Sequence, residues 1–284
     1  MRKNYLIFIC LIWIFMAGCG DSQKVLSGGE GEQSIEKFDE NDVKMMDQKQ
    51  QYDPDLKVDA NLSLTLDYPT FMFHYIEDVP ADTDDQMRYN LSYSPEKLEQ
   101  MLQIIKEDNI ETLTFWDIKA IAEGKKEKPE KGVILTFDDG HLSHYTESFR
   151  LLKKYNMKGV FFIISSKPDN DGAYANWSQI KEMADAGQEI ASHTVNHLNL
   201  TTLSDEDLQY ELEESKKLIE EKTGVPVISV CYPAGKYDDR VMDESNKYYL
   251  FGRTTQPFET IDWQDRFDIG TVRMFPTTDP TVVE

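Results

Sequence analysis

Short apolar runs alternate with amphipathic helical stretches from about Leu64 onward, and this alternation constrains the fold more than any other feature of the sequence. Parallel strands need crossover connections of helical length, so this pattern predicts an α/β fold with a parallel sheet. Seven or eight such units favour a (β/α) barrel of about seven parallel strands. A doubly wound open sheet is the alternative, because periodicity does not show whether a sheet closes. The predicted strands are residues 70–75, 110–113, 132–137, 159–164, 189–192, 225–231, 249–253 and 268–275.

Two of the predicted helices carry clear boundary signals. Ser94 precedes Pro95, which combines a capping hydroxyl with a proline in the first turn. Ser204 precedes the acidic run 205–207 and opens a long helix that should stop at Gly224. We therefore expect helices that begin just after these two serines.

The first 18 residues have the pattern of an export signal. A basic pair precedes an apolar run over residues 5–18, which is too short to span a bilayer. The run ends in Met16-Ala17-Gly18-Cys19, which resembles a bacterial lipoprotein box. We therefore expect a lipoprotein signal peptide over 1–18 and a lipid on Cys19. The protein would then be exported and lipid-anchored on the outer face of the bacterial cell membrane.

Residues 19–62 lack a sustained apolar period and are rich in Asp, Glu, Gln and Lys. This composition predicts an acidic flexible stalk, followed by a catalytic domain over 63–284. The sequence has 3 Cys. Cys10 would leave with the signal peptide and Cys19 would carry the lipid, so Cys231 has no disulfide partner.

The chain carries 52 Asp+Glu against 30 Lys+Arg, for a formal net charge of -22. Binding to nucleic acid is driven by Lys and Arg that displace counterions from phosphates, so nucleic acid is excluded as a main partner. With 40% hydrophobic residues, the chain is too apolar to be wholly disordered. We expect a compact acidic domain that is a monomer.

Carboxylates and imidazoles follow two of the predicted strands. Adjacent residues of a strand face opposite ways, so Asp138 and Asp139 can serve one site only where the strand ends, and Gly140 lets the backbone turn there. His193 and His197 are spaced i, i+4, so one turn of helix or a helix-like loop would direct both at one ion. Two histidines and a carboxylate from either aspartate leave a position open for water, as in catalytic metal sites.

These residues resemble the motifs of the polysaccharide deacetylase family, whose members are metal-dependent enzymes that remove N- or O-acetyl groups from glycans on a distorted (β/α) barrel. Residues 136–140 are similar to the family's first motif, which implies that Asp138 is the catalytic base and Asp139 a metal ligand. His193 and His197 match the second motif, which implies that both bind the metal.

Two further stretches extend the resemblance, which covers roughly residues 68–276. Pro233-Ala234-Gly235 resembles the third motif, which implies that the backbone N–H of Ala234 helps to hold the oxyanion. Tyr232 adjoins this motif, and we expect its ring to bind the sugar. Phe73-His74-Tyr75 is similar to the arrangement in exopolysaccharide poly-N-acetylglucosamine deacetylases, which implies that His74 is catalytic and protonates the leaving amine.

The chain departs from the family pattern at two positions. Many members have an arginine where Cys231 stands and an aromatic residue where Ala234 stands. The arginine orients the base elsewhere in the family. The candidates for that role, which the sequence does not rank, are Arg240, Arg253 and Arg273. His141 and His144 lie at a predicted helix start, and we expect them in a loop or on the surface rather than in the site.

The resemblance implies N-deacetylation of an acetylated cell-surface or extracellular polysaccharide, favouring one built on N-acetylglucosamine; peptidoglycan and acetylated xylan-type polymers stay open. Zn²⁺ suits two histidines and a carboxylate best, although Ni²⁺, Co²⁺ or Fe²⁺ fits the same ligands. The missing arginine prompts one alternative, a catalytically inactive glycan-binding surface lipoprotein. A glycosidase that uses Asp138 and Asp139 is disfavoured, because sequence neighbours are poorly placed to flank one bond about 5 Å apart.

Overall fold

The structure is a computed structural model that describes residues 62–283. The expected signal peptide over 1–18, Cys19 and the stalk up to residue 61 lie outside the described residues. Among the described residues, every helix is too short or too polar to span a bilayer.

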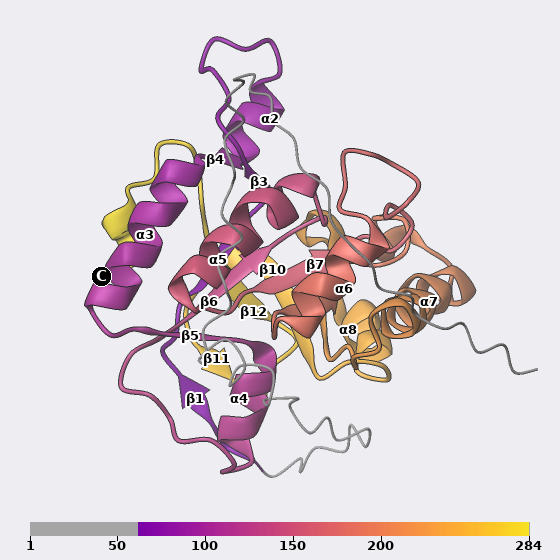
Figure 1. Ribbon diagram of the computed structural model, residues 1–284. Coiled ribbons are helices and arrows are strands. Elements are labelled where there is room, and N and C mark those ends of the chain that lie inside the picture. The colour runs from indigo at the N-terminus through magenta and orange to yellow at the C-terminus, as the bar shows by residue number, and fades with distance from the viewer. Residues whose placement is uncertain (1–61, 284) are drawn as a thin grey trace, which may run out of the picture. The chain divides into compact units, whose positions relative to one another are not determined.

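Within residues 62–283, seven parallel strands close into a barrel, with an eighth strand at its side (Figure 1). The strands are β2 (Thr70–Phe73), β5 (Glu111–Leu113), β6 (Gly132–Phe137), β7 (Val160–Ile163), β8 (Glu189–Ser192), β9 (Ser229–Cys231), β10 (Phe251–Pro257) and β12 (Ile269–Arg273). Their order around the ring is β2-β12-β10-β9-β8-β7-β6. The pairing of β6 with β2 closes the ring, while β5 pairs with the first half of β6. The predicted barrel is confirmed, and the open sheet is wrong.

Helices surround the barrel, and two small sheets lie beside it (Figure 1). The helices are α2 (Gln86–Leu91), α3 (Pro95–Glu107), α4 (Phe115–Ala122), α5 (Arg150–Tyr155), α6 (Trp177–Asp185), α7 (Asp205–Thr223) and α8 (Asp239–Ser245). Short 3₁₀ or π turns occupy His144–Phe149, Leu200–Thr202, Pro233–Gly235 and Pro280–Val283. The small sheets pair β1 (Thr65–Leu66) with β11 (Ile261–Asp262), and β3 (Tyr75–Ile76) with β4 (Ser92–Tyr93).

The predicted helix boundaries are confirmed. The Ser94 hydroxyl accepts a hydrogen bond from the Lys97 N–H at 3.2 Å, and α3 begins at the next residue. Ser204 caps α7 in the same way, and the helix ends at Gly224, whose φ of 76° is left-handed.

Alternate side chains of the strands divide the core into two layers. One cluster holds Ile134 of β6 and Ala191 of β8, while Leu135 and Ile190 belong to a second cluster that also contains helix residues such as Leu212. The first cluster therefore fills the barrel interior, and the second lies between barrel and helices. The same alternation continues to the carboxyl ends of the strands. It directs into the barrel the side chains of residues 74, 138, 193, 231 and 253.

Glu189 is an inward residue at the opposite end of β8 from His193, and it is buried. Its carboxylate accepts hydrogen bonds from the Phe115 N–H at 2.8 Å and the Ser229 hydroxyl at 2.5 Å. Burial raises the pKa of Glu189 from 4.5 to about 7. The stability that this group contributes is therefore fully present below pH 4.5 and is lost as the pH rises through about 7.

Replacing Glu189 with glutamine should remove this part of the pH dependence of stability. The melting temperature of Glu189→Gln should rise relative to that of the wild type as the pH increases from 5 to 8, because glutamine has no proton to lose. Thermal unfolding at several pH values measures the difference. If the melting temperatures of the variant and the wild type changed with pH in parallel, the raised pKa of Glu189 would be contradicted.

Candidate active site

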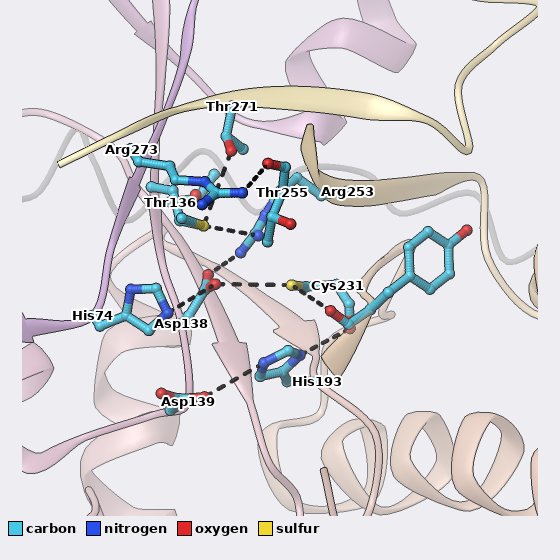
Figure 2. Close-up of polar contacts among 12 residues, drawn as sticks. His74, Thr136, Asp138, Asp139, His193, Cys231, Arg253, Thr255, Thr271 and Arg273 are labelled. Atoms are coloured by element: carbon cyan, nitrogen blue, oxygen red, sulfur yellow. Dashed lines mark hydrogen bonds and ion pairs between the residues drawn. The ribbon is translucent and has the colours of Figure 1, made fainter. Parts of the chain in front are cut away.

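Asp138 lies at the centre of a polar cluster at the carboxyl ends of the barrel strands (Figure 2). Arg253 of β10 forms an ion pair with its Oδ1. His74, which follows β2, places Nε2 at 3.8 Å from Oδ2, and the Cys231 Sγ lies at the same distance from that oxygen. Burial raises the pKa of Asp138, but the positive charge of Arg253, the largest opposing influence, helps to hold the pKa below its usual range. The carboxylate is therefore an ionised base in a dry environment.

Asp139 reaches the same site through a left-handed turn. Its φ is 80° and that of Gly140 is 83°. Non-glycine residues are uncommon in this region, and such backbone strain is concentrated at functional sites. The turn directs the Asp139 Oδ1 at His193 Nε2, 3.4 Å away, and at His197 Nε2, 3.7 Å away. The strand end thus brings both neighbouring carboxylates into one site.

Asp139, His193 and His197 form a donor set that fits a divalent metal ion. One ligand atom from each lies within 4.8 Å of the others. The His193 Nδ1 donates to the Cys231 carbonyl at 2.8 Å, which leaves the Nε2 lone pair directed at the site. Burial raises the pKa of Asp139, but the hydrogen bond from His141 and the charges around the site hold it well below its usual range, so an anionic ligand is present.

A second set of three, Asp138, His193 and Cys231, meets the same distance limit. This set suits a metal less well. Asp138 is already paired with Arg253, and burial raises the pKa of the Cys231 thiol, so the sulfur keeps its proton.

The two histidines lie on a loop and not on a turn of helix. Thr194 and His197 have φ values of 64° and 58°, and the Thr194 hydroxyl accepts the His197 N–H at 3.1 Å. Glu211 of α7 accepts both the backbone N–H of Asn196 at 2.8 Å and its side-chain amide at 2.7 Å. Glu211 therefore holds the loop between the two histidines. The sequence pointed to no role for Glu211, because it is one acid among many on α7.

Arg253 is the arginine that pairs with Asp138. It is 0% exposed, and it is the register partner of Cys231 on the neighbouring strand. Many family members carry this arginine at the position of Cys231. Here an arginine on the neighbouring strand β10 contacts Asp138 instead. Arg240 instead pairs with Asp205 on the outside of the barrel, and Arg273 donates to the Thr255 carbonyl at 2.6 Å.

The turn after β9 carries two residues that the sequence assigned to substrate binding. Ala234 is exposed with a φ of 51°, and its N–H donates no hydrogen bond to another described residue. Tyr232 is 0% exposed, and its hydroxyl donates to the Phe267 carbonyl at 3.2 Å. The expected sugar-binding role of Tyr232 is therefore wrong, because its parity directs the ring outward, beneath the helices.

His141 and His144 are also not where the sequence placed them. They are 4% and 1% exposed and lie beside the site, so the expected surface position is wrong, although neither belongs to a metal-type donor set among the described residues. The His141 Nε2 donates to the Asp139 Oδ2 at 3.1 Å, and the His144 Nε2 donates to the His74 carbonyl. Their i, i+3 spacing directly after Gly140 is the signal that would have placed both on one face.

In closed parallel barrels the active site lies at the carboxyl ends of the strands, which is where these carboxylates and histidines gather. A family model described as polysaccharide deacetylase matches residues 125–250. The Bacillus subtilis protein YxkH, named only as a candidate polysaccharide deacetylase, is 27% identical over 279 residues, which cover 97% of this chain and 95% of YxkH. The Streptococcus pyogenes deacetylase PplD, solved in complex with acetate, superposes with a TM-score of 0.70 at 25% identity, covering 77% of this chain and 96% of PplD.

Two further relatives match shorter stretches. The Escherichia coli poly-beta-1,6-N-acetyl-D-glucosamine N-deacetylase is 30% identical over 139 residues, which cover 44% of this chain and 20% of that protein. A Bacillus cereus peptidoglycan-N-acetylglucosamine deacetylase is 33% identical over 113 residues, which cover 39% of this chain and 50% of that protein. The chain is similar to polysaccharide deacetylases over nearly its whole length, and the activity that these comparisons support is the hydrolysis of acetyl groups from a polysaccharide.

Proposed function

We propose that this protein is a metal-dependent N-deacetylase of a polysaccharide built on N-acetylglucosamine. The observation that carries the proposal is a buried, ionised base beside a three-ligand donor set, with an acid candidate, His74, at 3.8 Å from that base. Two relatives named for N-acetylglucosamine polymers support an amide substrate. Zn²⁺ is the proposed ion, because two histidines, a carboxylate and an open position suit it.

The residues of the site divide the reaction between them. When bound, a divalent ion supplies Lewis acidity, which polarises an acetyl carbonyl and lowers the pKa of water. Asp138 takes the proton of the attacking water, and Arg253 keeps this carboxylate ionised and fixed. The N–H of Ala234, which donates to no other described residue, donates to the oxyanion as the carbonyl is attacked.

His74 completes the reaction by protonating the leaving nitrogen. Burial lowers the pKa of His74, and the charges of Asp138 and Asp139 only partly offset this, so the ring must receive a proton before it can donate one. Asp138 is near enough to pass on the proton that it took from water. The C–N bond then breaks, and acetate and a free amine leave.

Replacing His74 with alanine should lower turnover about 10²- to 10⁴-fold without loss of metal, because acid–base catalysis contributes about that much. Acetate release and metal content of the purified variant measure the two effects. Full activity at equal metal content would remove His74 from the mechanism.

We also propose that the protein acts at the outer face of the membrane, held by a lipid on Cys19. The lipoprotein-like box at residues 16–19 supports this. Globomycin treatment of cells, which blocks the lipoprotein signal peptidase, should leave the unprocessed precursor. Normal processing under that treatment would contradict the anchor.

Acetate release by the full chain from three substrates tests the substrate class. We expect β-1,6-linked N-acetylglucosamine oligomers to be deacetylated faster than peptidoglycan or acetylated xylan. Tight binding of the oligomers without acetate release would instead identify an inactive glycan-binding protein. The inactive alternative was prompted by the missing motif arginine. Arg253 pairs with Asp138, which weakens that alternative.

A further inference from the structure

The two carboxylate oxygens of Asp139 have different partners. Oδ1 faces His193 and His197 at 3.4 and 3.7 Å. Oδ2 accepts a hydrogen bond from the His141 Nε2 at 3.1 Å. His141 belongs to neither of the metal-type donor sets found among residues 62–283. It therefore contacts a metal ligand without being placed to bind the metal itself.

The His141 ring is held in a stack of aromatic rings. It lies on Tyr75 with centroids 3.8 Å apart and on Tyr174 with centroids 5.0 Å apart. Two cations close the stack, Arg88 at 5.0 Å from the Tyr75 centroid and Lys167 at 5.2 Å from the Tyr174 centroid. Three separate chain segments thus fix the plane of one imidazole.

Backbone contacts fix the same segment. His141 forms an antiparallel bridge with Tyr174, and the Leu142 N–H donates to the Ala173 carbonyl at 2.9 Å. The Ala175 N–H donates to the Gly140 carbonyl at 3.0 Å. The left-handed turn at Asp139 and the histidine that contacts it are therefore held as one unit.

The hydrogen bond to Asp139 is the one polar contact that the His141 ring makes among the described residues. Its Nδ1 is buried with no hydrogen-bond partner there. Because a carboxylate only accepts, the Nε2 carries the proton. The aromatic stack sets the ring plane, and the hydrogen bond sets the orientation of the carboxylate.

We propose that His141 is a positioning residue that occupies the Asp139 Oδ2, so that Asp139 offers only Oδ1 to the metal. This inference rests on the proposed function. Without the bond, Asp139 is free to rotate and to bind through both oxygens, which would occupy the position that a catalytic site keeps open. Partners of metal ligands typically change metal affinity 10- to 100-fold when they are removed.

Three variants of His141 separate the hydrogen bond from the ring. His141→Phe keeps a ring in the stack and lacks the donor. His141→Gln places an amide nitrogen near the position of Nε2, and His141→Asn carries the same amide one methylene too short to reach Asp139. The glutamine and asparagine variants are thus a matched pair, which also serves if the phenylalanine variant does not fold.

The readouts are Zn²⁺ affinity by competition with a chromophoric chelator, the visible spectrum of the Co²⁺ form, and the melting temperature of the metal-free protein. We expect His141→Phe and His141→Asn to bind Zn²⁺ about 10- to 100-fold more weakly, and His141→Gln to stay within a few fold of the wild type. The Co²⁺ absorption should weaken in the first two variants, because it falls as the coordination number rises. Similar metal-free melting temperatures would show that the fold is intact.

Unchanged Zn²⁺ affinity and an unchanged Co²⁺ spectrum in His141→Phe and His141→Asn would overturn the proposal. A loss far beyond 100-fold, with glutamine no better than asparagine, would overturn it too, since His141 would then be a ligand. Zn²⁺ affinity and the Co²⁺ spectrum are both measured without acetate release. A wild type that binds Zn²⁺ and releases no acetate therefore counts against the proposed function alone.

Discussion

Replacing Asp138 with asparagine should lower the turnover number by about 10²- to 10⁴-fold while Zn²⁺ affinity stays within a few fold of the wild type. The reason is the division of roles between two neighbours. Asp138 is paired with Arg253 and lies next to His74, whereas Asp139 faces His193 and His197. Acetate release under saturating substrate, together with a Zn²⁺ titration, measures both quantities.

Asp139→Asn is the matched control, because it makes the same chemical change one residue away. It should weaken Zn²⁺ binding and lose activity as a consequence. If Asp138→Asn instead lost the metal, or if Asp139→Asn kept it, the assignment of base and ligand would be reversed.

Replacing Arg253 with methionine should be the most destabilising single change in the site. Asp138 and Arg253 are both buried, so removal of the guanidinium leaves an uncompensated charge inside the barrel. Breaking a buried ion pair in this way costs about 3–5 kcal/mol of unfolding free energy. Denaturant unfolding of the metal-free protein measures the loss.

The double variant Asp138→Asn with Arg253→Met tests the cause of that loss. Because no charge then remains unpaired, it should be more stable than Arg253→Met alone. Equal stability of the single and double variants would mean that the loss comes from packing of the long arginine side chain and not from the charge of Asp138.

The sequence predicted the barrel strands well because buried parallel strands are short, apolar and separated by helices. Gly132–Phe137 and Glu189–Ser192 have the predicted bounds. Other strands differ: 225–231 is a strand only from Ser229, and 249–253 extends to Pro257. Closure was beyond prediction from periodicity, since it depends on pairing between β2 and β6, which are far apart in the chain.

The site was predictable where its residues lie next to each other in sequence. Arg253 was not singled out, because its approach to Asp138 depends on the register of β10 against β9. His141 was misplaced, because its burial comes from Tyr75 and Tyr174, which lie on separate segments. Tyr232 was assigned to the sugar through its place beside a motif, although its strand parity directs it away from the site.

We propose that acetate release depends on a metal held by Asp139, His193 and His197. Acetate released from N-acetylglucosamine oligomers by the full chain, after chelation and again after Zn²⁺ is restored, tests this most directly. We expect chelation to stop release and Zn²⁺ to restore it in the wild type but not in Asp139→Asn. Continued release from protein shown to be free of metal would contradict the claim.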